Sequence, residues 1–369
     1  MVPKERIVCA MSGGVDSSVA AALLVRQGFD VVGLYMRNGI EAGDAARRGK
    51  QGCCSLEDSM DARRVADTLG IPFYVLNLAQ EFGSIIEGFL DEYDRGRTPN
   101  PCIQCNRHLK FGRLLDYADS LGASSVATGH YARVRRDQGR FAISRAADLT
   151  KDQSYVLFPL EQNALARCRF PLGEMTKDSV RELARDMGLR VFDKPDSQEI
   201  CFVPGGDYRA LIRERRPENL GAGEIVDEQG KVLGRHEGYQ LFTIGQRRGF
   251  GKSFGRPVYV LDIDPHSHRV TVGDFEALTS GGLTLNAPVF QGLAGLRAGE
   301  ALEGTVKVRY RHDPSPARAI GREDGGVDVR FLAPVRAVTP GQAAVFYRGD
   351  VVAFGGYIDA VLGRDAVQP

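Results

Sequence analysis

The stretch Ser12-Gly13-Gly14-Val15-Asp16-Ser17-Ser18 decides the fold of the N-terminal part of this chain. It follows the apolar run Ile7-Val8-Cys9-Ala10-Met11, which predicts a short buried strand, and it leads into Val19 to Gly28, which predicts a helix ending at a glycine. A Gly-Gly turn between a strand and a helix N-terminus predicts an anion site, because backbone N–H groups and the helix dipole attract negative charge. The turn contains no lysine, so it is not a Walker A loop.

Strand-like and helix-like segments alternate over residues 1–206, which is typical of an α/β domain with a parallel sheet. Ligands in such sheets bind beyond the carboxyl ends of the strands, so we expect Ser12, Met36 and Gly129 to converge on one site. The further predicted strands are Val31–Met36, Phe73–Leu76 and Ser125–Thr128. Residues 37–54 are polar and Gly-rich and predict a loop. A helix is predicted over Ser55–Leu69, with Ser55 as its N-cap.

The pattern changes after about Asp207, where glycine, proline and short β-like runs dominate. We expect a small central β-rich domain over 207–278 and a C-terminal β-barrel over 279–369. The predicted strands are Glu224–Asp227 with Lys231–Gly234, Pro257–Ile263 with His268–Val272, and then Gly304–Tyr310, Val327–Phe331, Ala343–Tyr347 and Val351–Phe354.

Composition sets broad limits. The chain has 369 residues, of which 43% are hydrophobic and 26% charged, as in a globular protein of two or three domains. No apolar run approaches the ~20 residues of a membrane span, and Met1 to Arg6 lead directly into a strand without a signal-peptide core, so a cytoplasmic protein without a membrane partner is expected. The net charge of +1 does not by itself indicate a nucleic-acid binder.

The seven cysteines are too few for a disulfide scaffold in a chain of this length. In Arg97-Thr98-Pro99-Asn100-Pro101-Cys102-Ile103-Gln104-Cys105, two prolines stiffen the approach to Cys102. We expect Cys105 to begin a helix over Asn106 to Asp116, where the helix N-terminus and the basic residues Arg107, His108 and Lys110 favour a reactive thiolate. The alternative is half of a zinc site, but no second C-x-x-C pair occurs.

The other cysteines carry less information. Cys201, between Ile200 and Phe202, has a pattern more typical of core than of function. Cys9 and Cys168 are expected in the core, and Cys53-Cys54 in a structural or loop role.

Taken together, the motifs resemble the bacterial-type tRNA-specific 2-thiouridylases of the ATP pyrophosphatase (PP-loop) superfamily, over almost the whole chain. The matching stretches are Ala10–Ser18, Gly33–Met36, Gly96–Asn106, Ala127–Ala132, Lys151–Tyr155, Ser197–Phe202, Phe242–Gly249, Val308–Arg311 and Thr339–Tyr347. The resemblance implies ATP-dependent 2-thiolation of the wobble uridine of tRNA. The C2 oxygen would be adenylated and then replaced by sulfur from a cysteine persulfide.

The resemblance also implies roles for individual residues. It implies Cys105 as the nucleophile and Cys201 as the persulfide carrier, which would leave a Cys105–Cys201 disulfide after sulfur transfer. ATP with Mg²⁺ would be bound by Ala10, Met11, Ser12, Gly13, Gly14, Val15, Asp16, Ser17, Met36 and Gly129, with Asp16 expected on the metal. The target base would meet Asn100, Pro101 and Cys102, and the tRNA would contact His130, Lys151, Asp152, Gln153, Arg309, Tyr310 and Gln342.

One position departs from the family pattern, since many members have Asp where this chain has Cys102. Cys102, Cys105 and Cys201 could then hold a [4Fe-4S] cluster that carries the sulfur instead. The implied partners are tRNA and a sulfur donor, either a cysteine desulfurase or a relay protein, and the implied state is a monomer. Two other hypotheses stay open: an AMP-forming amidating synthetase of the same superfamily, and a non-enzymatic redox or RNA-binding module.

Overall fold

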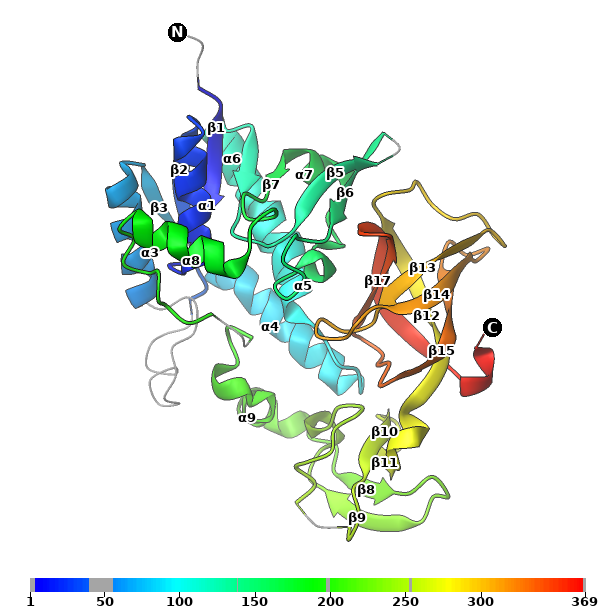
Figure 1. Ribbon diagram of the computed structural model, residues 1–369. Coiled ribbons are helices and arrows are strands. Elements are labelled where there is room, and N and C mark those ends of the chain that lie inside the picture. Colours follow the sequence, from blue (N-terminus) through cyan, green and yellow to red (C-terminus); the bar gives the residue numbers. More distant parts are fainter. Residues whose placement is uncertain (1–3, 40–55, 138, 197–199, 252–253, 368–369) are drawn as a thin grey trace.

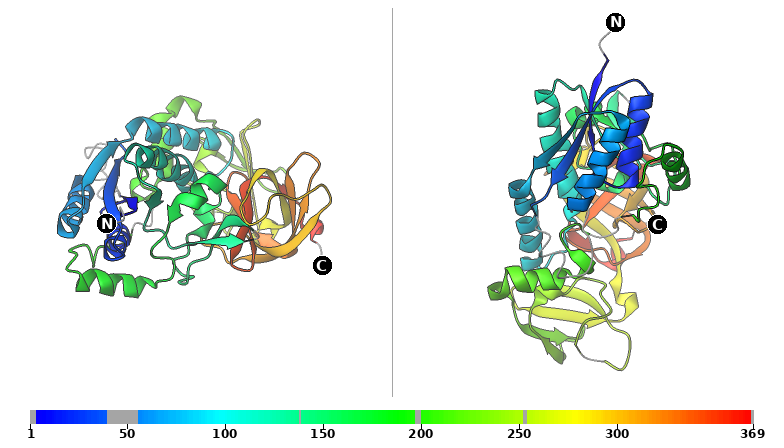
Figure 2. Two further views of the ribbon diagram at one scale, coloured as in Figure 1. Left: turned by 90° about the horizontal axis from the view of Figure 1, so that it is seen from above. Right: turned by 90° about the vertical axis from the view of Figure 1, so that its left-hand side faces the viewer.

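The computed structural model describes residues 4–39, 56–137, 139–196, 200–251 and 254–367 (Figure 1). Three bodies are arranged around one long helix, α4 (Ala79–Asp94): a layered α/β domain, a small β domain beyond α9 (Tyr208–Arg215), and a barrel that holds the C-terminus. The views in Figure 2 show the same division from two further directions. The predicted helix cap Ser55 and the pair Cys53-Cys54 lie outside the described residues.

The N-terminal domain is a five-stranded parallel sheet with helices on both faces, as predicted. Its strands, in spatial order, are β3 (Phe73–Asn77), β2 (Asp30–Arg37), β1 (Arg6–Ala10), β4 (Ser125–Ala127) and β7 (Cys168–Arg169). Alternation along β1 sends Ile7 and Cys9 to one core and Val8 to the other. The first core is covered by α1 (Val15–Arg26), α3 (Leu56–Leu69) and α8 (Lys177–Asp186), and the second by α6 (Leu114–Ser120).

Two helix starts differ from the prediction. Helix α1 begins at Val15 rather than Val19, directly after the glycine turn. The helix that carries the paired cysteines begins at Pro101 rather than at Cys105, because the Asn100 side chain caps it and proline is favoured in the first helical position. It runs as α5 (Pro101–Gln104), a π-helical stretch (Cys105–Arg113) and α6. Cys102, and not Cys105, is therefore the cysteine in the first turn.

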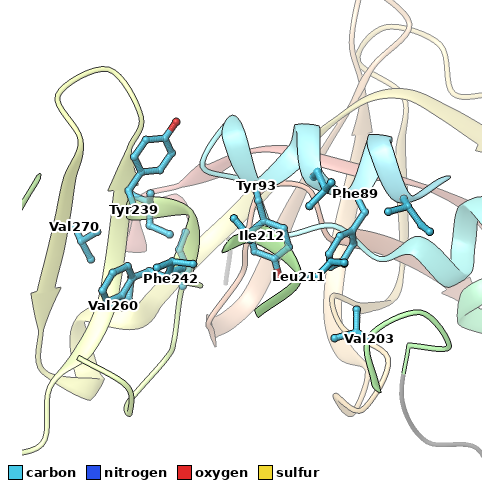
Figure 3. Close-up of a cluster of buried hydrophobic side chains, with 14 of the residues drawn as sticks. Phe89, Tyr93, Val203, Leu211, Ile212, Tyr239, Phe242, Val260 and Val270 are labelled. Carbon is cyan, nitrogen blue, oxygen red and sulfur yellow. The ribbon is translucent and has the colours of Figure 1, made fainter. Parts of the chain in front are cut away.

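The central domain is a four-stranded sheet in the order β10-β11-β8-β9. Both predicted hairpins are present, as β8 (Gly223–Val226) with β9 (Val232–His236) and β10 (Tyr259–Asp264) with β11 (Arg269–Gly273). A continuous apolar cluster joins this sheet to α4 and α9 (Figure 3). Phe89 and Tyr93 of α4, Leu211 and Ile212 of α9, and Val260 and Val270 of the sheet belong to this cluster, which we call the α4 cluster.

The C-terminal domain is a closed barrel, because β12 pairs with both β15 and β17. Its strands are β12 (Thr279–Phe290), β13 (Ala301–Lys307), β14 (Ser315–Gly321), β15 (Val327–Arg336), β16 (Ala343–Arg348) and β17 (Val351–Leu362). The predicted strand over Gly304–Tyr310 ends earlier, at Lys307, so Tyr310 lies in the turn that follows.

A hairpin of the N-terminal domain attaches to this barrel, which the sequence did not predict. It consists of β5 (Arg133–Asp137) and β6 (Arg140–Ser144), and it extends the barrel sheet where Ser144 pairs with Val351 of β17. A helix, α7 (Gln162–Arg167), packs on the hairpin. In the described ranges, no helix is long and apolar enough to cross a membrane.

Candidate functional site

The glycine turn lies at the point where strand order reverses in the parallel sheet, between β1 and β4. Gly14 is the N-cap of α1 in extended conformation, and serine hydroxyls stabilise the turn. The Ser17 hydroxyl accepts a hydrogen bond from the Ser12 N–H at 3.0 Å and donates one to the Gly14 carbonyl oxygen at 3.2 Å. Ala10, Met11 and Val15 are buried, and so are Ser17 and Ser18. Ser12 is the exposed residue of the turn, and Gly14 and Asp16 are half-buried.

Two glycines allow the chain to pass very close to this turn. A Cβ atom on Gly129, after β4, would lie 2.6 Å from the Ser17 backbone nitrogen. A Cβ atom on Gly13, where φ is +75°, would lie 2.2 Å from the Asp58 carbonyl oxygen. The structure thus places Gly129 against the loop, and Met36 lies half-buried at the end of the neighbouring strand β2.

A lysine that the sequence analysis missed lies at the loop. Lys177, at the start of α8, is buried to 7% exposure and donates to both carboxylate oxygens of Asp16 at 2.8 Å. The Tyr131 hydroxyl also donates to Asp16, at 2.8 Å. The Lys177 ammonium reaches the Asp196 carboxylate at 2.7 Å as well. The cation that the loop itself lacks is therefore supplied from a distant helix.

Other charged residues of the chain after α8 contact the glycine turn and its surroundings. The Lys194 ammonium donates to the Gly13 carbonyl oxygen at 3.0 Å and pairs with Asp58 and Asp61 at the start of α3. Lys151 pairs with Asp196 at 2.8 Å. Lys151 and Lys177 together outweigh burial and hold the pKa of Asp196 at about 2, so this carboxylate stays ionised.

The barrel holds the loop that precedes the cysteine helix. The Gln342 side-chain amide donates to the carbonyl oxygens of Thr98 at 3.0 Å and Pro99 at 3.3 Å. Arg97 donates to the Ile358 carbonyl oxygen at 3.2 Å, and its own partner in α4 is Glu92. Asn100 and Cys102 follow directly, so the barrel sets the position of the predicted target-base loop.

Cys105 and Cys201 contact the same apolar region although they are far apart in sequence. Both are half-buried and both pack against the α4 cluster, and each is a thiol. The basic neighbours of Cys105 have partners elsewhere: Arg107 pairs with Glu161, and Lys110 contacts His130. Cys9 and Cys168 are buried as predicted, and burial raises the pKa of the Cys9 thiol to about 12.

Cys102 is exposed and lies close enough to Tyr310 in the barrel's turn to affect its ionisation. Tyr310 is 38% exposed, and burial together with the charges of Asp152 and Cys102 raises its pKa. The Lys307 ammonium lies 5.6 Å from the centre of that ring. An exposed ring beside an exposed thiol can stack an unpaired base.

Arg309 occupies a different position from Tyr310. Its guanidinium donates to the Ile244 carbonyl oxygen of the central domain at 3.1 Å and to the Thr339 hydroxyl at 2.6 Å. It therefore joins the barrel to the central domain, and its Nε atom is buried without a hydrogen-bond partner.

Besides Arg309 and Gln342, four further predicted tRNA contacts have partners within the protein. His130 is buried, with Thr128 at 2.7 Å from its Nδ1, and burial together with Lys110 keeps its pKa well below the usual value. Asp152 accepts from the Ala146 N–H and from Ser154, and Gln153 accepts from the Tyr131 N–H. Lys151 pairs with Asp196, as described above.

The three cysteines do not form a metal site as they are arranged. Among the described residues, no group of three or more His, Cys, Asp or Glu side chains could hold a metal ion. The expectation that Cys102, Cys105 and Cys201 together ligate a [4Fe-4S] cluster is therefore not supported by their geometry. A four-iron cluster needs its cysteine ligands grouped around one centre.

Three domain-family models match the chain in succession. They are described as a tRNA methyl transferase HUP domain over residues 5–205, a tRNA methyl transferase PRC-barrel domain over 209–274, and an aminomethyltransferase beta-barrel domain over 283–358. Their order agrees with the α/β domain, the small central sheet and the closed barrel.

Full-length relatives match as well. A tRNA-specific 2-thiouridylase MnmA from Solibacter usitatus is 48% identical over 97% of this chain and 100% of its own length. One of the same name from Geobacter metallireducens is 50% identical over 97% of this chain and 98% of its own length. Among solved structures, NMN synthetase from Francisella tularensis is 17% identical with a TM-score of 0.33, and covers 53% of this chain and 67% of that one.

Proposed function

The chain belongs to the family of tRNA-specific 2-thiouridylases, and we propose that it uses ATP to replace the C2 oxygen of the wobble uridine of tRNA with sulfur. The observation that carries this proposal is the placement of Cys105 and Cys201. They lie on separate segments against one apolar cluster, and the barrel holds the loop that precedes Cys105. Neither cysteine would be needed by an enzyme that only transferred AMP.

The first half-reaction is activation of the base. The C2 oxygen attacks the α-phosphorus of ATP, and the bond to pyrophosphate breaks. The N–H groups of the Ser12 to Ser17 turn and the dipole of α1 stabilise the charge on the departing pyrophosphate. Mg²⁺ fits this chemistry, since it binds substrate phosphates together with one or two carboxylates, and Asp16 is the carboxylate of the turn. Bound there, the ion would neutralise phosphate charge.

The second half-reaction transfers sulfur. A persulfide on Cys201 supplies the sulfur, and Cys105 as thiolate attacks the inner sulfur atom, which belongs to Cys201. The outer sulfur leaves as hydrosulfide with the bonding electron pair, attacks C2 and expels AMP. The outer sulfur is thereby reduced, the two cysteines are oxidised to a disulfide, and an external thiol reductant restores them. The two Cα atoms must come within about 4.4–6.8 Å for this step.

Substrate binding requires the base to leave the anticodon stack. We propose that the uridine enters beside Asn100 and Cys102 and stacks on the Tyr310 ring, which is exposed at that place. Cys102 replaces the carboxylate of many family members, so we assign no acid or base role to this position. We further propose that the protein acts as a cytoplasmic monomer. Its sulfur would come from a cysteine desulfurase or a relay protein.

The experiment incubates the purified full chain with Mg·ATP, unmodified tRNA and a persulfide-forming sulfur donor, followed by mass spectrometry of the nucleosides. We expect 2-thiouridine, with loss in Cys105→Ser and Cys201→Ser while tRNA binding persists. Cys168→Ala is the matched control, because Cys168 is buried in β7. Full thiolation by both site variants would overturn the cysteine assignment.

Other products would point to other functions. In a parallel incubation that also contains a methyl donor, a methylated nucleoside without sulfur would favour the activity in the domain descriptions. In another that contains ammonium, ATP cleavage that depends on it would favour an amidating synthetase. Binding of tRNA without ATP turnover would favour a non-enzymatic module.

A further inference from the structure

Lys177 contacts both the carboxylate of the glycine turn, Asp16, and Asp196 in the segment that leads to Cys201. Its ammonium lies 2.8 Å from each oxygen of Asp16 and 2.7 Å from Asp196. With 7% exposure it is among the few buried charges described in the protein. A buried cation needs such partners, because desolvation of an unpaired charge is very unfavourable.

The surroundings of Lys177 are arranged to keep it at the turn. The Tyr131 ring lies 5.9 Å below the ammonium and its hydroxyl donates to Asp16. Asp148 accepts from the Lys177 backbone N–H at 3.0 Å, which fixes the start of α8. The side chain is therefore directed at Asp16 by contacts on both its ammonium and its backbone.

The second carboxylate, Asp196, has other cations available. Lys151 lies 2.8 Å and Arg181 3.2 Å from it. If Lys177 turned from Asp196 toward a phosphate oxygen, Asp196 would remain paired. Asp16 has the Tyr131 hydroxyl as its other partner in these contacts. Lys177 can thus move to a competing anion without leaving either of these half-buried carboxylates unpaired.

We propose that Lys177 is the phosphate-binding cation of the turn, and that it exchanges Asp196 for the β- and γ-phosphates when Mg·ATP binds. This inference rests on the proposed function, because it assumes that ATP binds at the turn. It assigns to α8 the charge that a lysine within the loop supplies in Walker A proteins. It also connects nucleotide binding to Asp196, five positions before Cys201.

The experiment measures the affinity of the full chain for Mg·ATP, Mg·pyrophosphate and AMP by calorimetry. Lys177→Met should bind ATP and pyrophosphate roughly ten- to a hundredfold more weakly, as expected for the loss of a hydrogen bond to a charged group. AMP affinity should change less than about twofold, because AMP lacks the β- and γ-phosphates. Lys177→Arg should restore much of the affinity, which a purely structural role would not predict.

A second test concerns Asp196, whose substitution should change the affinity for ATP in the direction opposite to Lys177→Met. Asp196→Asn removes the competing carboxylate, so it should tighten ATP binding severalfold in the wild-type background and have no such effect with Lys177→Met. Arg181→Met is the matched control. Arg181 also contacts Asp196, and its other hydrogen bonds are to the carbonyl oxygens of Phe192 and Lys194.

The outcomes separate the two proposals. If the wild-type chain binds neither ATP nor pyrophosphate, the proposed function fails. If it binds both and Lys177→Met binds them equally well, or loses AMP affinity to the same extent, the assignment of Lys177 fails. An unchanged ATP affinity in Asp196→Asn would overturn the exchange.

Discussion

The side-chain amide of Gln342 in the barrel lies 3.0 Å from the carbonyl oxygen of Thr98, 244 residues earlier in the chain. The backbone N–H of Thr98 donates to the Pro340 carbonyl oxygen, also at 3.0 Å. The backbone N–H and the carbonyl group of Thr98 are therefore both hydrogen-bonded to the barrel. The cysteine helix begins three residues further on, at Pro101, so the barrel fixes the approach to that helix in the N-terminal domain.

Gln342→Ala should slow thiolation more than it weakens tRNA binding. The variant loses two hydrogen bonds to the loop, which predicts a fall in kcat of roughly three- to thirtyfold. Single-turnover rates and tRNA affinity, measured separately, check this. A large rise in the tRNA Kd with an unchanged rate would instead mean that Gln342 acts mainly by touching the tRNA.

Gly129→Ala should impair ATP use. Its Cβ would lie 2.6 Å from the Ser17 nitrogen and 2.7 Å from the Asp16 carbonyl carbon, and backbone atoms there cannot shift cheaply. We expect a loss of stability of about 1–3 kcal/mol from overpacking and at least a tenfold rise in KM for ATP. Pyrophosphate release and urea unfolding measure the two effects.

The matched control for that glycine is Gly88 on α4, where a Cβ meets nothing within 4 Å. Gly88→Ala should raise the free energy of unfolding by roughly 0.4–1 kcal/mol, because it restricts the unfolded chain. A similar loss of activity in both alanine variants would show that steric closeness to Ser17 is not the cause.

Stability should fall as the pH drops, in part because of His130. Burial holds the pKa of this imidazole well below its usual value of 6.5, so it stays neutral in the folded protein and takes up a proton on unfolding in mild acid. The free energy of unfolding therefore decreases below about pH 6.5, by at most about 1.4 kcal/mol per pH unit for this group. His130→Asn should show a shallower decrease in urea titrations between about pH 7 and about pH 5.

A matched change at the exposed His266 should leave the slope as in the wild type. If His130→Asn retained the full dependence on pH, other groups would account for it.

Arg309→Met should weaken the junction between barrel and central domain. It removes the hydrogen bonds to Ile244 and Thr339 in a partly buried place, which predicts a loss of about 1–3 kcal/mol. Limited proteolysis would detect the weakened junction, and thermal unfolding would measure the loss of stability. Arg311→Met, at an exposed position in the same turn, should instead reduce the salt dependence of tRNA binding.

Local chemistry explains which elements could be predicted from sequence. The strand before Ser12, the glycine turn and both central hairpins depend on residues within a few positions of one another, and all are present. The start of the cysteine helix was predicted wrongly although its signal is local too, since Asn100 and Pro101 are a favoured N-cap and first residue.

The sequence by itself determined the anion-binding turn, the cysteines available for chemistry and the succession of three domains, because these depend on short-range backbone preferences and residue type. Only the tertiary structure brought Lys177 to Asp16, Gln342 to Thr98 and the β5–β6 hairpin to the barrel. Those contacts join segments more than a hundred residues apart. Their formation depends on how whole layers pack, and no local pattern of residues encodes that.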